Sequence, residues 1–171
     1  MIAHLLDIPI PADLPDARIQ NRAESPITRP DLDIWESLTR PGAPLPADLL
    51  DSDGPFAPRL REQGIEAWTE VELSSLHALT AFAFTRNDEH AMSRCRSSVL
   101  WHLDNMQPDN GTNRPWGLHA FALFADQHPD AALHAQTLVH NACVQRGRPD
   151  KRSALILLHS AKVLRHAERT H

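Results

Sequence analysis

The sequence predicts an all-α protein, and three observations lead to that prediction. Apolar residues recur at helical spacing from about residue 69 to residue 166. Short links rich in Pro, Gly, Asp and Asn separate the helical segments and leave no room for strands. A four-residue pattern also returns about once every 41 residues. Together these features predict an open array of about two and a half stacked helical hairpins, preceded by a proline-rich arm.

Composition limits the class of protein. A chain of 171 residues with 42% apolar content can bury one substantial core. The net charge of -5, without a long run of one sign, argues against nucleic acid as a partner. No apolar run approaches the roughly twenty residues of a membrane span, so no membrane is expected. The first residues lack the basic region of a signal peptide, and Cys95 and Cys143 suit reduced thiols, so we expect a cytoplasmic protein.

Residues 1–66 are predicted to form the arm. Ten of the fourteen prolines lie there and prevent long helices. Short helical turns fit between them at 31–39, 47–50 and 58–63. Scattered apolar residues, among them Ile34 and Trp35, favour an arm that packs along its own helical body or along a partner subunit. A mobile tail is the alternative.

Residues 67–171 are predicted to form the helical-hairpin domain. Its first helix begins at a capping box, Thr69-Glu70-Val71-Glu72, in which Thr69 would bond the backbone of Glu72. Pro108 to Gly111 provide turn residues that end the second helix, and Pro115 suits the first position of the third. The five expected helices cover approximately residues 69–86, 88–107, 115–126, 129–147 and 150–166.

The repeated pattern lies in the first, third and fifth of these helices. Leu76-His77-Ala78-Leu79, Leu118-His119-Ala120-Phe121 and Leu158-His159-Ser160-Ala161 start 42 and 40 residues apart. Two helices per period indicate hairpins that stack and share one core, because a single hairpin cannot bury its apolar face alone.

The stretch WTEVELSSLHAL, with the later turn WHLDNMQPDNGTNRPWGLHAF, resembles the helical-hairpin repeat of α/α-toroid proteins, in particular an uncharacterised bacterial family. The resemblance covers residues 68–165 and does not include the arm. It implies layers of inner and outer helices but no activity. Closed toroids contain more hairpins than this chain, so the resemblance implies an open arc or a ring completed by other subunits. Solenoids of the tetratricopeptide or HEAT kind are the alternative architecture.

His77, His119 and His159 share one repeat position, which allows two interpretations. The three rings could converge and bind a metal or an anion, or each could pack at a seam between helices. Repetition favours the structural interpretation. His102, Asp104, Asp109 and His119 offer nitrogen and oxygen ligands, but they lack a recognised metal-binding spacing. We therefore predict no metal and no cofactor.

The turn between the second and third helices is the strongest candidate for a ligand site. It is polar and ends at a helix N-terminus, which favours anions. An arginine there could hold a carboxylate or phosphate, and a tryptophan could stack on a sugar. A self-satisfied loop is the alternative. The candidate ligand-binding residues are His102, Asp109, Asn113, Arg114, Trp116 and His119. No catalytic residue is assigned, since no nucleophile elbow or glycine-rich phosphate loop occurs.

Two functional hypotheses follow. The first is a non-catalytic helical-repeat scaffold or protein-interaction module that self-associates. The second is an enzyme or ligand-binding protein for a polar metabolite or sugar, with its site at the 101–119 turn. The second rests on analogy with other toroids alone. We therefore expect a protein partner or a second copy of the chain, and a small ligand stays open.

Overall fold

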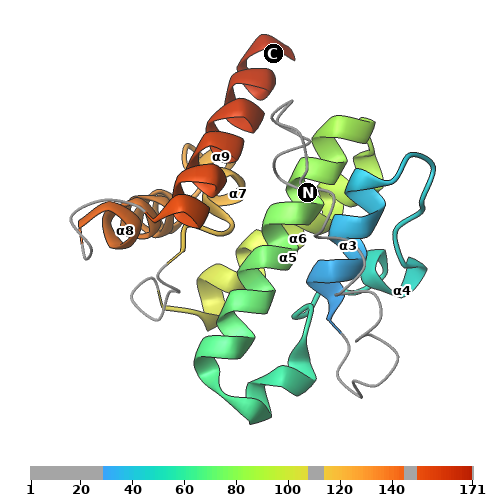
Figure 1. The fold of residues 1–171 in the computed structure, drawn as a ribbon, viewed down its shortest axis with the longest axis horizontal. Helices are drawn as coiled ribbons and strands as arrows, with labels where there is room; N and C mark the ends of the chain where they lie inside the picture. The colour runs from blue at the N-terminus through green and yellow to red at the C-terminus, as the bar shows by residue number, and fades with distance from the viewer. Residues whose placement is uncertain (1–28, 108–113, 145–149, 171) are drawn as a thin grey trace.

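A computed structural model of the chain describes residues 29–107, 114–144 and 150–170. Within these ranges the structure contains helices and no strand, which confirms the all-α class (Figure 1). The elements are α3 (Pro30–Thr39), α4 (Ala47–Leu50), the 3-10 helix η2 (Pro58–Gln63), α5 (Ile65–Arg86), α6 (Glu89–Asn105), α7 (Leu118–Leu123), α8 (Pro129–Val144) and α9 (Lys151–Thr170).

Helix α5 is the centre of the molecule. It runs between α3 on one side and α7 and α9 on the other, with α6 packed along it (Figure 1). Leu76, Ala78 and Leu79 are completely buried, and buried residues continue around every side of the helix from Trp68 to Ala83. A helix that is enclosed on all sides needs apolar or internally bonded residues throughout, and α5 has both.

The helices after α5 are arranged as neighbouring pairs. Helix α6 packs on α5, and α8 packs on α7. The two pairs meet where α7 packs on α5, and α9 then packs on α7. Helices α6 and α8 also touch one another. Within the pairs α5–α6 and α7–α8, helices that follow one another in the sequence are therefore also in contact. The further description of these pairs as a repeat array or part of a toroid stays a prediction.

The described part of the proline-rich region packs on its own chain. Its three short helices, α3, α4 and η2, lie where the spacing of the prolines predicts them. Ile34, Trp35 and Leu38 of α3 are buried against α5. The Arg94 guanidinium of α6 donates to the carbonyls of Leu49 and Gly54 at 2.9 and 2.7 Å, which fastens the α4 segment to the body. Residues 1–28 lie outside the described residues.

The predicted capping box is wrong. Helix α5 begins four residues earlier, at Ile65, and Thr69 is a buried interior residue whose hydroxyl has no hydrogen-bond partner in the described structure. The Glu72 carboxylate instead accepts the backbone N–H groups of Phe56 and Ala57, at 2.9 and 2.6 Å. The chain before α5 folds back onto the helix, so a tertiary partner replaces the local cap.

Helix α7 is shorter than predicted, because Gly117 interrupts its start. Gly117 has φ +75°, a left-handed conformation that ends the turn after Pro115 and places the first helical residue at Leu118. A Cβ at this position would lie 3.4 Å from Phe121 and 3.5 Å from Leu73, which are ordinary van der Waals distances, so the positive φ is the reason for glycine here. None of the helices in the described ranges combines the length and the apolarity that a membrane span needs.

Candidate functional site

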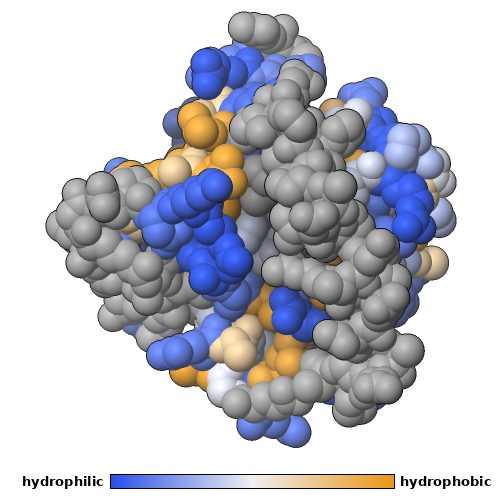
Figure 2. Space-filling model, in the orientation of Figure 1, coloured by the Kyte–Doolittle hydropathy of each residue, from blue (hydrophilic) through white to orange (hydrophobic). Residues whose placement is uncertain are grey.

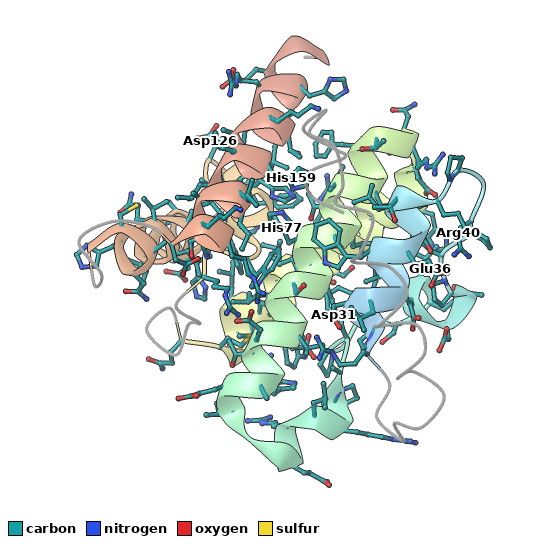
Figure 3. All side chains as sticks on the ribbon, viewed as in Figure 1. Asp31, Glu36, Arg40, His77, Asp126 and His159 are labelled. Carbon is teal, nitrogen blue, oxygen red and sulfur yellow. The ribbon has the colours of Figure 1, made fainter. Side chains whose placement is uncertain are left out.

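The three histidines of the repeated pattern meet inside the molecule. They are His77 on α5, His119 on α7 and His159 on α9. The ring centroid of His77 lies 4.2 Å from that of His119 and 4.9 Å from that of His159, and the centroids of His119 and His159 are 5.8 Å apart. All three are almost completely buried. Figure 3 shows His77 and His159 pointing toward one another from α5 and α9. We call these three residues the histidine cluster.

Hydrogen bonds fix the tautomer of His77. The backbone N–H of Gly117 donates to His77 Nδ1 at 3.3 Å, so this nitrogen carries no proton. The proton of the neutral ring is therefore on Nε2, which donates to His159 Nδ1 at 2.7 Å. His119 Nδ1 lies 3.3 Å from the Ser160 hydroxyl, and its Nε2 has no hydrogen-bond partner in the described structure. The cluster thus links α5 directly to α9.

Burial keeps the cluster uncharged. It lowers the pKa of His77 well below the ordinary value, with the neighbouring His119 and His159 as lesser causes. The pKa of His119 falls to about 3, through burial first and then through His159. Burial, with a smaller contribution from Lys162, lowers the pKa of His159 to about 4. All three rings are therefore neutral near pH 7.

The geometry does not favour a metal in the cluster. Neutral imidazole is a good metal ligand, but His77 Nε2 holds the proton that a metal would have to displace. That nitrogen lies 2.7 Å from His159 Nδ1, whereas neighbouring ligands of tetrahedral zinc are about 3.3 Å apart. In the described residues no group of three metal-ligating side chains is arranged to hold an ion. The arrangement is a hydrogen-bonded seam between three helices.

Two tryptophans enclose the histidine cluster. The ring of Trp116 lies edge-on to His77, with centroids 5.2 Å apart, and the ring of Trp35 lies 5.8 Å from His77. Trp35 Nε1 donates to the Ser74 hydroxyl at 3.2 Å, which ties α3 to α5. These aromatic walls exclude water from the rings and account for much of their desolvation.

Arg114, the predicted anion binder, has a carboxylate partner within the chain. Its guanidinium pairs with Glu70, which also accepts Trp116 Nε1 at 2.9 Å. Glu70 therefore holds two of the predicted ligand residues at the start of α7. The Arg114 and Glu70 side chains are 35% and 27% exposed, so solvent still reaches this group.

His102 lies in a second buried group, on α6. Its Nδ1 lies 2.6 Å from the carbonyl of Ser98, which can only accept, so Nδ1 donates. Its Nε2 faces Glu72 Oε2 at 3.4 Å, an ion-pair distance that is too long and misaligned for a hydrogen bond. Both side chains are fully buried. Since Glu72 also holds the backbone of Phe56 and Ala57, this group joins α6, α5 and the segment before η2.

The predicted ligand residues do not share one described hollow. His102 is beside Glu72, His119 belongs to the histidine cluster, and Arg114 and Trp116 share Glu70. Asp109 and Asn113 lie outside the described residues, so a ligand at this turn stays a prediction. Two hollows in the described structure are lined by other residues. One, of about 500 Å³, lies on α8, and the other, of about 170 Å³, lies between α3, α4 and α6.

The predicted capping box placed Glu70 and Glu72 at the start of a helix, so neither residue was expected to organise tertiary contacts. The spacing contained a usable signal for Glu72. It lies four residues after Trp68 and four before Leu76, in the middle of an apolar helical stripe. A carboxylate at such a position is expected to be buried and bonded, as Glu72 is.

No protein-family model, no curated protein and no solved structure matches this chain. The resemblance to α/α-toroid repeats therefore has no support from these comparisons, and the function has to be argued from the geometry alone.

Proposed function

We propose that this chain is a non-catalytic helical scaffold that self-associates through the open face of α8 and α9. The exposure of one repeated position carries the proposal. Leu76 on α5 is fully buried, Leu118 on α7 is half-buried, and Leu158 on α9 is 54% exposed. In a stack of hairpins a helix is covered by neighbours on both sides. The rise in exposure is what the last member of such a stack shows when its next neighbour is missing.

Helix α8 adds apolar surface at the same end of the molecule. Leu133 is 52% exposed and Val139 is 38% exposed. The hollow of about 500 Å³ lies on this face, and its walls include Leu118, Val139 and Cys143. Figure 2 shows apolar surface beside hydrophilic surface in the region of α9. Several large apolar side chains exposed at one end of a molecule are typical of a protein interface.

The internal chemistry also supports a structural role. The histidine cluster, Glu72 and His102 are buried and connect helices to one another. A scaffold needs such rigid seams, whereas acid–base catalysis needs groups that substrate can reach. No described hollow favours the alternative of an enzyme acting on a sugar or polar metabolite.

The test is the mass of the protein in solution over a range of concentrations, by light scattering after size exclusion and by native mass spectrometry. We expect an oligomer that Leu158→Glu converts to monomer. The matched control is Ile65→Glu, since Ile65 is 51% exposed but lies at the start of α5, away from α8 and α9. A wild-type monomer at every concentration, or equal effects of the two substitutions, would refute the proposal.

Cys143 provides a second readout on the same face. It is partly exposed in the α8 hollow. Cys95 is fully buried, and burial raises its pKa to about 12, so it serves as an internal unreactive control. We expect maleimide labelling of Cys143 to slow as the protein concentration rises, because association covers this thiol. Labelling independent of concentration would place the interface elsewhere.

A further inference from the structure

The exposed face of α9 is basic as well as apolar. Lys151, Leu158, Lys162 and Arg165 are spaced seven, four and three residues apart, so they share one face of the helix. All four are exposed, and the buried residues Ile156, Ser160 and Val163 lie on the opposite face. Helix α9 contains five basic residues and one acidic residue, although the whole chain has a net charge of -5. We call these four residues the basic face.

A complementary surface lies around α4. Residues 45–56 contain three aspartates and no lysine or arginine. Asp48, Asp51 and Asp53 are exposed, and Leu49 beside them is partly exposed at the hollow of about 170 Å³. The nearby Arg94 is buried and donates to Ser98 and to two backbone carbonyls, so its charge is directed inward. We call Asp48, Leu49, Asp51 and Asp53 the acidic face.

The two faces lie at opposite ends of the molecule. Helix α4 packs on α6 on one side of α5, and α9 packs on α7 on the other side (Figure 1). The basic face of a chain therefore cannot meet its own acidic face, but it can meet the acidic face of another copy. Two basic faces brought together by a twofold axis would repel one another instead.

We propose that copies of this chain associate head to tail, with the basic face of α9 docked on the acidic face around α4 of the next copy. This inference rests on the proposed self-association and specifies its geometry. The partner copy supplies a neighbour for Leu158 and opposite charge for Lys162 and Arg165. Because the two contacting surfaces differ, the assembly extends until it closes into a ring or continues as a chain of subunits.

The experiment uses two charge-reversed full-length chains. One carries Asp48→Lys with Asp51→Lys, and the other carries Lys162→Glu with Arg165→Glu. We expect each to be monomeric alone, since its two faces then have the same sign. A mixture of equal amounts should assemble again, because both contacts are then complementary. Asp104→Lys, at an exposed position on α6, is the control and should assemble as the wild type does.

The outcomes separate this inference from the proposed function. If the wild type assembles and the Asp48 and Asp51 variant assembles equally well, the head-to-tail geometry is refuted while self-association stands. If the mixture stays monomeric, the geometry is also refuted. A wild type that is monomeric at every concentration refutes both. Raising the salt from about 50 to about 500 mM should weaken wild-type association by about tenfold, because it screens the contact between the two faces. Circular dichroism verifies that every variant is folded.

Discussion

Acid should unfold this protein through its histidine cluster. The unfolded chain binds protons at histidine below pH about 6.5, whereas the pKa of His159 in the folded protein is about 4 and that of His119 about 3. The pKa of His77 is lowered in the same direction. The unfolded state therefore binds more protons between these values, so the free energy of unfolding is highest above pH about 7 and falls as the pH falls.

The expected loss follows from these pKa values. For His119 and His159, protonation of the unfolded chain lowers the free energy of unfolding by about 1 kcal/mol each at pH 6 and about 2 kcal/mol each at pH 5. These two residues together remove about 2 kcal/mol at pH 6 and about 4 kcal/mol at pH 5, and the lowered pKa of His77 adds to the loss in the same direction. Since domains are typically stable by about 5–15 kcal/mol, a large part of the stability is lost by pH 5. The lowered pKa of His134, also caused mainly by burial, adds to the loss.

Urea denaturation followed by far-UV circular dichroism at pH 8, 7, 6 and 5 measures this loss. His159→Asn removes one titrating ring but keeps an acceptor near the Nδ1 position for His77 Nε2–H, so it should reduce the loss of stability at pH 5 by about 2 kcal/mol. His90→Asn is the control, because His90 is exposed on α6 and should leave the dependence unchanged. Stability that is constant from pH 7 to pH 5 would refute burial of neutral rings, as would an unchanged slope in His159→Asn.

Two further substitutions test the packing around the central helix. Glu72→Gln should lower the free energy of unfolding by about 2 kcal/mol, because it removes the charge that bonds two backbone N–H groups and faces His102; an unchanged urea midpoint would show that the carboxylate is not buried. Gly117→Ala should lower the free energy of unfolding by about 1–2 kcal/mol, because φ +75° strains any residue with a Cβ, while the added Cβ itself would make only ordinary van der Waals contacts. A melting temperature equal to that of the wild type would contradict the left-handed conformation at Gly117.

Much of the secondary structure follows from local sequence. The positions of α3, α4 and η2 were set by prolines and by the glycine that follows them, and α6 by its apolar stripe. These signals act over one or two turns of chain, where backbone sterics and hydrogen bonding between neighbours dominate. The same local signals failed at the start of α5, where Glu72 bonds to residues that precede the helix instead of capping it.

The candidate site could be predicted only in part. Spacings of 42 and 40 residues suggested that His77, His119 and His159 share one repeat position. The pattern allowed the three rings either to converge or to pack at separate seams between helices. Sequence also identified Arg114 and Trp116 as a pair of interest, without their partner Glu70. These contacts join residues about 40 to 80 positions apart.

Periodicity in the sequence determines which residues share a face of a helix. It does not determine which faces meet. That depends on how the helices pack, and packing is decided by the combined fit of many side chains from distant parts of the chain. Helical class and the order of the elements were therefore determined by the sequence. The convergence of His77, His119 and His159, their loss of charge and the exposure of Leu158 were decided by the tertiary structure.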